Sequence, residues 1–359
     1  MLLSVILVHY HTPDLAALAL AALRADVAEM AGLAAEWLLV DNGSDEDERA
    51  RLAALPVRRI DPGENLGYAG GVNRGIAATG AELLVVMNPD VIVFPGCLPA
   101  LIDRLQSGAA VAGPAFFWDD GRRLLLPPAE RRGRREEVAA LLARRGEARG
   151  TRARRRWRRH ARRHWEARSP LPSYSLSGSL LALTRQAWEE VGPFDAGYRL
   201  FFEETDWLLR AERRGVPSWY VPHAEAVHLY NQSAGREPRA QGWFEESARR
   251  FRRLHYGAPF AEALESLDGR LPPVQTPSLP SVPGAGLDLS GLPFPLWVEV
   301  SPNPEGFPAA AEFLREPPSG PWRLPQEVEE RLPAGTTLTV QVTDAAGREL
   351  FRGRLEEER

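Results

Sequence analysis

The stretch LLVVMNPD at residues 83–90 combines five consecutive apolar residues with an Asn-Pro turn. A short aliphatic run that ends in a turn is typical of a strand buried on both faces of a sheet. Two earlier runs have the same form, SVILV at residues 4–8 and WLLV at residues 37–40. Helical patterns separate the three runs. The first third of the chain therefore predicts an α/β domain with a mainly parallel sheet and flanking helices.

Polar side chains follow two of these expected strands. Asp41 comes directly after one apolar run, and Asn88 and Asp90 come after another. Ligands of open parallel sheets bind outside the carboxyl ends of the strands. Asp41 is suited to accept a hydrogen bond from a nucleobase N–H or a ribose hydroxyl. The ordinary alternatives are a strand-to-helix cap for Asp41 and an Asx-Pro turn for Asp90.

A glycine-rich stretch, NLGYAGGVNRG, covers residues 65–75. The absence of side chains at Gly67 and Gly70 lets a pyrophosphate or a sugar approach the backbone, and Asn65 and Asn73 offer amide donors. The stretch lacks the Gly-Lys-Ser/Thr ending of a phosphate-binding P-loop. A tight turn that opens a helix is the alternative interpretation.

An acidic cluster lies in the segment FFEETDWLLR, where Glu203, Glu204 and Asp206 come within four positions. Acidic residues are favoured in the first turn of a helix, so the pattern predicts a helix over residues 203–214. Crowded and buried carboxyl groups also shift one another's pKa upward. One of the three is therefore a candidate general base that works near neutral pH.

The composition divides the chain into parts. We expect an α/β domain at residues 1–265 with an inserted segment at 130–168, a proline-rich linker at 266–290 and a small β-rich module at 291–359. All 44 basic residues of the chain are arginine, and 16 of them fall between residues 131 and 168, against four glutamates.

The arginine-rich insert has three interpretations. A solvated, partly disordered charged arm is the simplest. Attachment to anionic lipid headgroups, with Trp157 and Trp165 as interfacial anchors, comes second. Nucleic acid is the least favoured partner. Cys97 is the only cysteine, and no apolar run reaches the ~18 residues of a membrane span. We therefore expect a cytoplasmic protein whose membrane association, if any, is peripheral on the inner face of the cell membrane.

An ordered series of motifs carries a family resemblance. In order and spacing the series resembles the family 2 inverting glycosyltransferases of the GT-A fold, especially their rhamnosyltransferase-like branch. The resemblance covers about residues 2–257 and leaves out the arginine-rich insert and the C-terminal module. The motifs are HYHTPDL (9–15), LLVDNGSDED (38–47), NLGYAGGVNRGI (65–76), MNPDVIVFPG (87–96), GPFDAGYRLFFEETDWLLR (192–210) and VPHAEAVH (221–228).

The resemblance implies roles for individual residues. Asp90, with His228, is implied to hold a divalent metal, Mn²⁺ or Mg²⁺, since Asn88-Pro89-Asp90 occupies the place of the family's Asp-x-Asp motif. Glu204 is implied to be the general base, where the family usually has Asp, with Asp206 as the fallback and Glu203 beside them. The implied donor-binding residues are Asp41, Asn65, Gly67, Gly70, Asn73 and Asn88.

The implied reaction moves a sugar from a dTDP-, UDP- or GDP-linked donor to a hydroxyl of a glycan or lipid-linked glycan in polysaccharide biosynthesis. The branch favours a deoxyhexose such as rhamnose on dTDP. One alternative is a sugar-nucleotide nucleotidyltransferase, but HYHTPD stands where that class has a Gly-rich loop with Arg and Lys. The other is a non-catalytic carbohydrate- or membrane-binding protein on the same scaffold, which Asn88 and Glu204 keep open because both depart from the family pattern.

Overall fold

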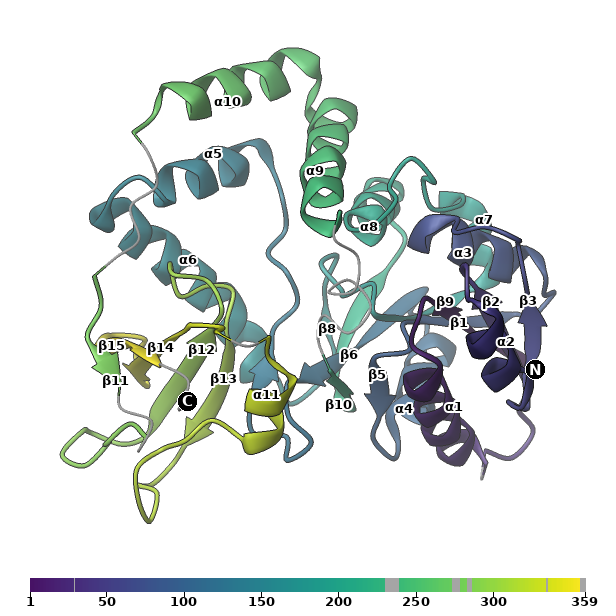
Figure 1. Ribbon diagram of the computed structural model, residues 1–359, viewed down its shortest axis with the longest axis horizontal. Helices are drawn as coiled ribbons and strands as arrows, with labels where there is room; N and C mark the ends of the chain where they lie inside the picture. Colours follow the sequence, from purple (N-terminus) through teal and green to yellow (C-terminus); the bar gives the residue numbers. More distant parts are fainter. Residues whose placement is uncertain (29, 230–238, 273–277, 283–285, 334, 356–359) are drawn as a thin grey trace. The chain divides into compact units, whose positions relative to one another are not determined.

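The computed structural model describes the whole chain except residues 29, 230–238, 273–277, 283–285, 334 and 356–359. The chain forms two compact units, each built from two segments of the sequence (Figure 1). The N-terminal unit comprises residues 1–115 and 168–262. The C-terminal unit comprises residues 116–167 and 263–359.

The N-terminal unit is built on a mixed sheet with the strand order β3-β2-β1-β4-β9-β6. Strands β3, β2, β1 and β4 run parallel to one another, and β9 runs antiparallel to both β4 and β6. The expected α/β fold with its parallel strands is confirmed. The strands are β1 (Leu2–His9), β2 (Ala34–Asp41), β3 (Arg58–Ile60), β4 (Leu83–Met87), β6 (Val111–Phe117) and β9 (Leu180–Thr184).

Two short strands of this unit pair antiparallel with β10 (Ser218–His228). Strand β10 pairs with β5 (Val91–Val93) and with β8 (Leu171–Pro172). In the first pairing His228 lies opposite Val91. The end of β10 is thereby placed beside the turn that follows β4.

Helices cover both faces of the sheet: α1 and α4 lie on one face, and α3, α7 and α8 lie on the other (Figure 1). Helix α8 has the bounds that the acidic cluster predicts. Helix α10 crosses the boundary between the units. The helices are α1 (Pro13–Val27), α2 (Glu46–Ala53), α3 (Gly67–Ala77), α4 (Cys97–Gln106), α7 (Arg185–Val191), α8 (Glu203–Arg214), α9 (Ala240–Tyr256) and α10 (Ala258–Arg270).

Local chemistry explains where these helices begin and how closely they pack. Asp45 and Glu48 form a reciprocal capping box at the start of α2. Helix α3 packs tightly on β1 because it carries glycine on the packed face. A methyl group on Gly71 would lie 2.6 Å from Val8 Cγ1, and one on Gly75 would overlap Ile6.

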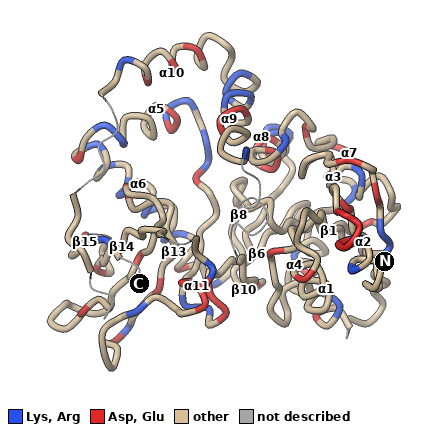
Figure 2. Tube along the Cα trace, in the orientation of Figure 1, with Lys and Arg blue, Asp and Glu red and all other residues tan. Residues whose placement is uncertain are grey.

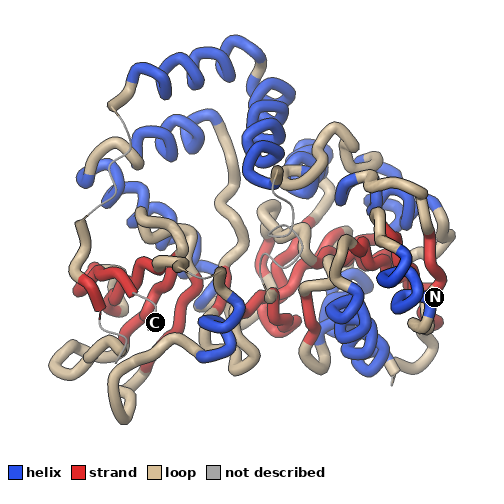
Figure 3. The backbone as a smooth tube through the Cα atoms, in the orientation of Figure 1, coloured by secondary structure: helices blue, strands red, loops and turns tan. Residues whose placement is uncertain are grey.

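The C-terminal unit holds a second group of strands in the order β11-β15-β14-β12-β13-β7 (Figure 3). The β-rich module expected at residues 291–359 is present. The strands are β7 (Leu125–Leu126), β11 (Ser281–Val282), β12 (Leu296–Ser301), β13 (Ala310–Leu314), β14 (Leu338–Asp344) and β15 (Glu349–Leu355); the helices are α5 (Arg134–Ala143), α6 (Glu147–Trp165) and α11 (Gln326–Arg331).

The arginine-rich insert is ordered as α5 and α6, which differs from the expected charged arm. Its two tryptophans are not interfacial anchors: Trp157 and Trp165 are 3% and 2% exposed. Trp165 stacks on Trp297 of β12 with ring centroids 5.1 Å apart. The reason is amphipathicity, because the apolar residues of α6 fall on the face that packs against the strands.

The structure divides the chain differently from the expected domain limits. The insert packs with the C-terminal strands, and its α6 supplies part of their core. In the expected linker at 266–290, α10 extends to Arg270 and β11 forms at Ser281–Val282, while residues 273–277 and 283–285 lie outside the described part. Within the described residues no helix combines the length and apolarity needed to cross a membrane.

Candidate active site

Asp41 ends β2 and is 1% exposed. The backbone N–H of Ser44 donates to its Oδ1 atom at 3.0 Å, which is the strand-to-helix cap that the sequence allows. The Oδ2 atom is buried and has no hydrogen-bond partner within the described residues. A buried carboxylate oxygen without a donor is costly, so a ligand N–H or O–H at this position would satisfy it.

His9 lies opposite Asp41 in the β1–β2 register, and the sequence analysis did not single it out. The backbone N–H of Thr12 donates to His9 Nε2 at 3.0 Å, so the ring proton sits on Nδ1. Nδ1 lies 3.2 Å from Ser44 Oγ and 3.8 Å from Asp41 Oδ1. Burial lowers the pKa of His9, although the Asp41 charge opposes the shift. His9 therefore presents a neutral N–H toward Asp41. The sequence signal that could have identified His9 as a site residue is its position at the end of an expected strand, as for Asp41.

Asn42 fixes the glycine-rich loop. Its Oδ1 accepts from the N–H of Leu66 at 3.0 Å, and its Nδ2 donates to the carbonyl of Gly67 at 2.9 Å. Asn65 Oδ1 accepts from the N–H of Gly67 at 2.8 Å. Gly67 has φ +71°, and a Cβ there would lie 2.5 Å from the carbonyl oxygen of Arg199. The space left by the missing side chain of Gly67 is thus used by the protein's own backbone.

Two other residues of the glycine-rich stretch also contact their own chain. Asn73 Nδ2 donates to the carbonyl of Phe194 at 2.9 Å, and its Oδ1 accepts from the N–H of the same residue at 3.0 Å. A Cβ on Gly70 would lie 2.7 Å from Leu66 Cβ. Asn73 therefore ties α3 to the segment that leads to the acidic cluster.

Asp90 and His228 are brought together by the β5–β10 pairing. His228 Nε2 lies 3.6 Å from Asp90 Oδ1, and Asp90 is 3% exposed. Ser179 joins them: its Oγ lies 3.5 Å from His228 Nε2, and its carbonyl accepts from the N–H of Asn88 at 2.9 Å. In the part of the chain that the structure describes, no three His, Cys, Asp or Glu side chains gather as a metal cluster.

The acidic cluster stands in the first turn of α8, after Phe202 in the left-handed region at φ +71°. Glu203 is 5% exposed, whereas Glu204 is half-buried. Burial raises the pKa of the Glu203 carboxyl well above its ordinary value, and the charge of Glu204 adds to the shift. Thr205 Oγ1 donates to Glu204 Oε1 at 3.3 Å. The two adjacent carboxyls therefore have unequal environments.

Asp206 belongs to an ion-pair network. Its Oδ1 lies 2.7 Å from His255 Nε2, and its Oδ2 accepts from Arg210 Nε at 2.8 Å. Burial alone would raise the pKa of Asp206, but the hydrogen bond from His255 and the Arg210 charge hold it below its ordinary value. Both carboxylate oxygens are engaged, an arrangement that stabilises the charged form and disfavours proton uptake.

Tyr68 contacts the backbone that lies between the Asp90–His228 pair and the acidic cluster, and the sequence analysis passed over it. Its hydroxyl donates to the carbonyl of Gly178 at 2.7 Å. Loss of hydration raises the pKa of the Tyr68 phenol well above its ordinary value, with further contributions from the charges of Glu203, Glu204 and Asp90. The negative charges of Asp90 and of the adjacent Glu203 and Glu204, which come from two separate segments of the sequence, therefore act on the same phenol.

Gly178 and Ser179 form the backbone between these groups. A Cβ on Gly178 would lie 2.9 Å from Glu204 Cβ, so only glycine leaves room for that side chain. The next residue, Ser179, contacts His228 as described above. In the sequence, the only feature that could have identified this segment as part of the site is a glycine among serines, SLSGS, before β9.

Comparisons with known proteins identify the family of the chain. The model of the Glycosyl transferase family 2 matches residues 4–165. Over 216 residues the chain is 34% identical to the N-acetylglucosaminyl-diphospho-decaprenol L-rhamnosyltransferase of Mycobacterium tuberculosis, covering 56% of this chain and 68% of the relative. Over 199 residues it is 22% identical to a low-salt glycan biosynthesis hexosyltransferase of Haloferax volcanii, covering 54% of this chain and 59% of that relative.

Among solved structures, a mannosyltransferase from Pyrobaculum calidifontis in complex with GDP-Man and Mn²⁺ aligns with a TM-score of 0.44 and 14% identity, covering 74% of each chain. The family match and the mycobacterial relative agree with the motif series in the N-terminal unit. The chain is therefore a member of glycosyltransferase family 2, in its rhamnosyltransferase-like branch, with the GT-A-type α/β fold.

Proposed function

We propose that this glycosyltransferase moves a deoxyhexose, such as rhamnose, from a nucleoside diphosphate to a hydroxyl of a lipid-linked glycan, with inversion at the anomeric carbon. The observation that supports it most is that the consecutive residues Gly178 and Ser179 lie against Glu204 and His228, which brings the acidic cluster beside the Asp90–His228 pair. Sugar transfer needs a group that neutralises the departing diphosphate and a base beside the attacking hydroxyl. The lipid-linked acceptor is proposed by analogy with the mycobacterial relative, whose name gives a diphospho-decaprenol-linked sugar as its substrate. Family membership sets the nucleotidyltransferase alternative aside.

The donor is proposed to lie at the carboxyl ends of β1, β2 and β4. The Oδ2 atom of Asp41, which has no partner among the described residues, fits a nucleobase or ribose donor group, while the N–H of Ser44 holds the other carboxylate oxygen in place. In this proposal the glycine-rich loop contributes to the donor site through its shape. Contacts within the chain set that shape, and they involve Asn65, Gly67, Gly70 and Asn73.

Asp90 and His228 are proposed to hold the divalent cation. A carboxylate and an imidazole 3.6 Å apart suit Mn²⁺ or a similar ion whose other ligands come from phosphate and water. When bound, such a cation neutralises charge on the leaving diphosphate. Asn88, at the start of the same turn, contributes through its backbone bond to Ser179.

Glu204 is proposed as the general base. It takes the proton of the acceptor hydroxyl while that oxygen attacks the anomeric carbon, and the bond from this carbon to the diphosphate oxygen breaks with its electron pair on the diphosphate. Burial and the charge of Glu204 raise the pKa of Glu203 and so favour its neutral form, and a neutral neighbour in turn favours ionisation of Glu204. Asp206 is a positioning residue in this scheme, since His255 and Arg210 occupy its carboxylate.

A thermal-shift panel of UDP-, dTDP- and GDP-sugars, with and without Mn²⁺ or Mg²⁺, tests the donor site. A ligand at 100 times its dissociation constant stabilises the folded protein by ~2.7 kcal/mol, a readily measured shift. We expect one nucleotide to raise the midpoint only with metal, and Asp90→Ala to abolish that rise. No shift with any donor in the presence of metal would favour the non-catalytic alternative instead.

A further inference from the structure

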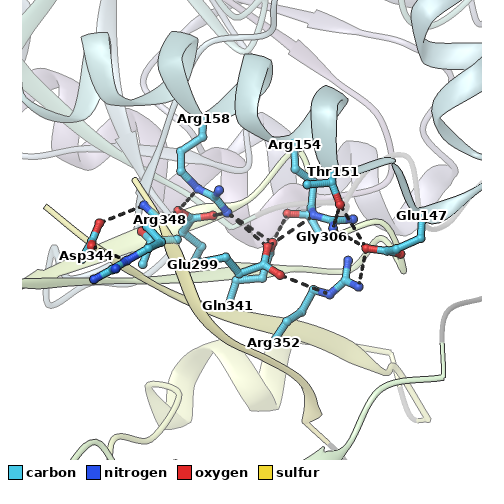
Figure 4. Close-up of polar contacts among 12 residues, drawn as sticks. Glu147, Thr151, Arg154, Arg158, Glu299, Gly306, Gln341, Asp344, Arg348 and Arg352 are labelled. Carbon is cyan, nitrogen blue, oxygen red and sulfur yellow. Dashed lines mark hydrogen bonds and ion pairs between the residues drawn. The ribbon is translucent and has the colours of Figure 1, made fainter. Parts of the chain in front are cut away.

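The arginines of α6 fall into two sets with different surroundings. One set faces the strands of the C-terminal unit: Arg154 and Arg158 are both 3% exposed. Arg158 bonds Glu299 and Gln341, and Arg154 bonds Glu147 (Figure 4). Internal ion pairs and hydrogen bonds engage these arginines, so they add nothing to the positive charge of the molecular surface.

The second set points away from the strands. Exposed arginines recur every three or four residues, which places them on one side of the helix. They are Arg149, Arg152, Arg155, Arg159 and Arg163. The stripe spans 15 residues, or about 21 Å between its ends at the rise of an α-helix. We call these five residues the outer arginine stripe.

No acidic residue interrupts the outer arginine stripe, because α6 has none between Glu147 and the residue after its end, Glu166. In the described ranges, no carboxylate lies within ion-pair distance of Arg152, Arg155 or Arg159. Figure 2 shows further arginines on the neighbouring helix α5. The central arginines of the stripe, Arg152, Arg155 and Arg159, therefore form a row of positive charge directed at solvent.

We propose that the outer arginine stripe binds the phosphate groups of an anionic lipid surface. A straight row of charges on one helix matches a planar array of headgroups. The tryptophans of α6, which would stack on bases in a nucleic-acid complex, are buried against the strands. The choice of lipid rests on the proposed lipid-linked acceptor, which would lie in a membrane.

The binding is purely electrostatic in this proposal, since the helix exposes no apolar anchor. It therefore needs anionic lipid and weakens as salt shortens the screening length. Each arginine near an anionic surface strengthens binding about five-fold, so removal of three should weaken it roughly 100-fold. The effect should follow the position of the lost charges and not only their number.

Vesicle flotation of the full chain tests the proposal, with phosphatidylcholine vesicles that contain or lack phosphatidylglycerol. We expect flotation only with phosphatidylglycerol, release at high salt, and loss in the triple variant Arg152→Gln, Arg155→Gln, Arg159→Gln. The matched control Arg74→Gln, Arg214→Gln, Arg323→Gln removes the same charge from exposed positions elsewhere and should float like the unmodified chain. Equal flotation of the two triple variants would overturn the assignment to α6.

Competition experiments with two other phosphate compounds test whether the partner of the stripe is a lipid surface. Inorganic phosphate should release the protein no better than chloride at equal ionic strength; specific release would indicate a discrete phosphate site. If a DNA duplex binds the chain at salt concentrations where the vesicles do not, the partner of the stripe is a nucleic acid and not a lipid surface. Nucleotide-dependent thermal shifts should persist in the triple variant, so failure of the lipid proposal is distinguishable from failure of the donor site.

Discussion

Arg158 of α6 and Glu299 of β12 form a bidentate salt bridge across 141 sequence positions (Figure 4). The Nε–Oε1 and Nη2–Oε2 distances are 2.5 and 2.9 Å, and the side chains are 4% and 0% exposed. Gln341 and Thr343 add hydrogen bonds to the same pair. This bridge joins the arginine-rich insert to the C-terminal strands, two segments that the sequence presents as unrelated.

Breaking this pair should destabilise the C-terminal unit strongly. Glu299→Gln removes the bidentate counter-charge of the buried Arg158 guanidinium and leaves it the longer contact with Glu349 at 3.9 Å, so we expect a loss of about 3–5 kcal/mol. The double variant Arg158→Met, Glu299→Leu should lose much less, because no buried charge is left unpaired. Urea unfolding of the three proteins measures this. A single variant that is as stable as the double would contradict the buried-charge argument.

Glu204→Gln should reduce kcat by ~100-fold or more, since loss of a general base costs about that much. Donor-induced thermal stabilisation should remain, because the proposed donor contacts lie on other segments. Glu204→Asp, which keeps the carboxylate, should retain part of the activity. Glu246→Gln on the exposed side of α9 is the matched control and should behave as the unmodified enzyme. If Glu204→Gln turns over normally, the base lies elsewhere.

Asp206→Asn should lower the stability of the folded protein, and it should not remove the general base of the reaction. The amide cannot pair with Arg210 as a carboxylate does, so the midpoint of unfolding should fall. The folded-state pKa of Asp206 is depressed, so its contribution is present above the unfolded-state value of about 3.9 and is lost as pH falls through the folded value. The stability gap between Asp206→Asn and the unmodified chain should therefore narrow only in strong acid, as unfolding at several pH values would reveal.

The buried His164 predicts that the stability of the protein already falls in mildly acidic solution. Burial lowers the pKa of His164 to about 4, against about 6.5 in an unfolded chain. The unfolded state therefore binds a proton first, and stability falls as pH drops from about 6.5 toward 4, by roughly 3 kcal/mol in total. His164→Gln should flatten that part of the profile. His223→Gln, at an exposed position, should leave the profile unchanged.

Gly75→Ala should destabilise the N-terminal unit by about 1–3 kcal/mol, because the added methyl overlaps Ile6 and pushes α3 off β1. Gly80→Ala is the matched control, with no atom within 4 Å of the added methyl. We expect its unfolding midpoint in urea to be unchanged or slightly higher. Equal midpoints for the two variants would mean that α3 adjusts to the extra volume.

Much of the N-terminal unit was predictable because its signals are local. The runs that become β1, β2 and β4 are continuous and apolar, and the acids of α8 stand in the first turn of a helix with the predicted bounds. The motif series predicted the family, which the comparisons confirm. The roles of the individual site residues remain predictions.

The sequence by itself determined the element types and the family, since apolar periodicity, caps and short motifs depend on neighbouring residues. Only the tertiary structure decided which charges are buried and which carboxyls meet. His255 reaches Asp206 from 49 positions away, and Tyr68 reaches Gly178 from 110. The same holds for α6, where packing against β12 and β14 separates the buried arginines from the exposed ones. Such distinctions arise from contacts between distant segments, and no pattern within a single segment encodes them.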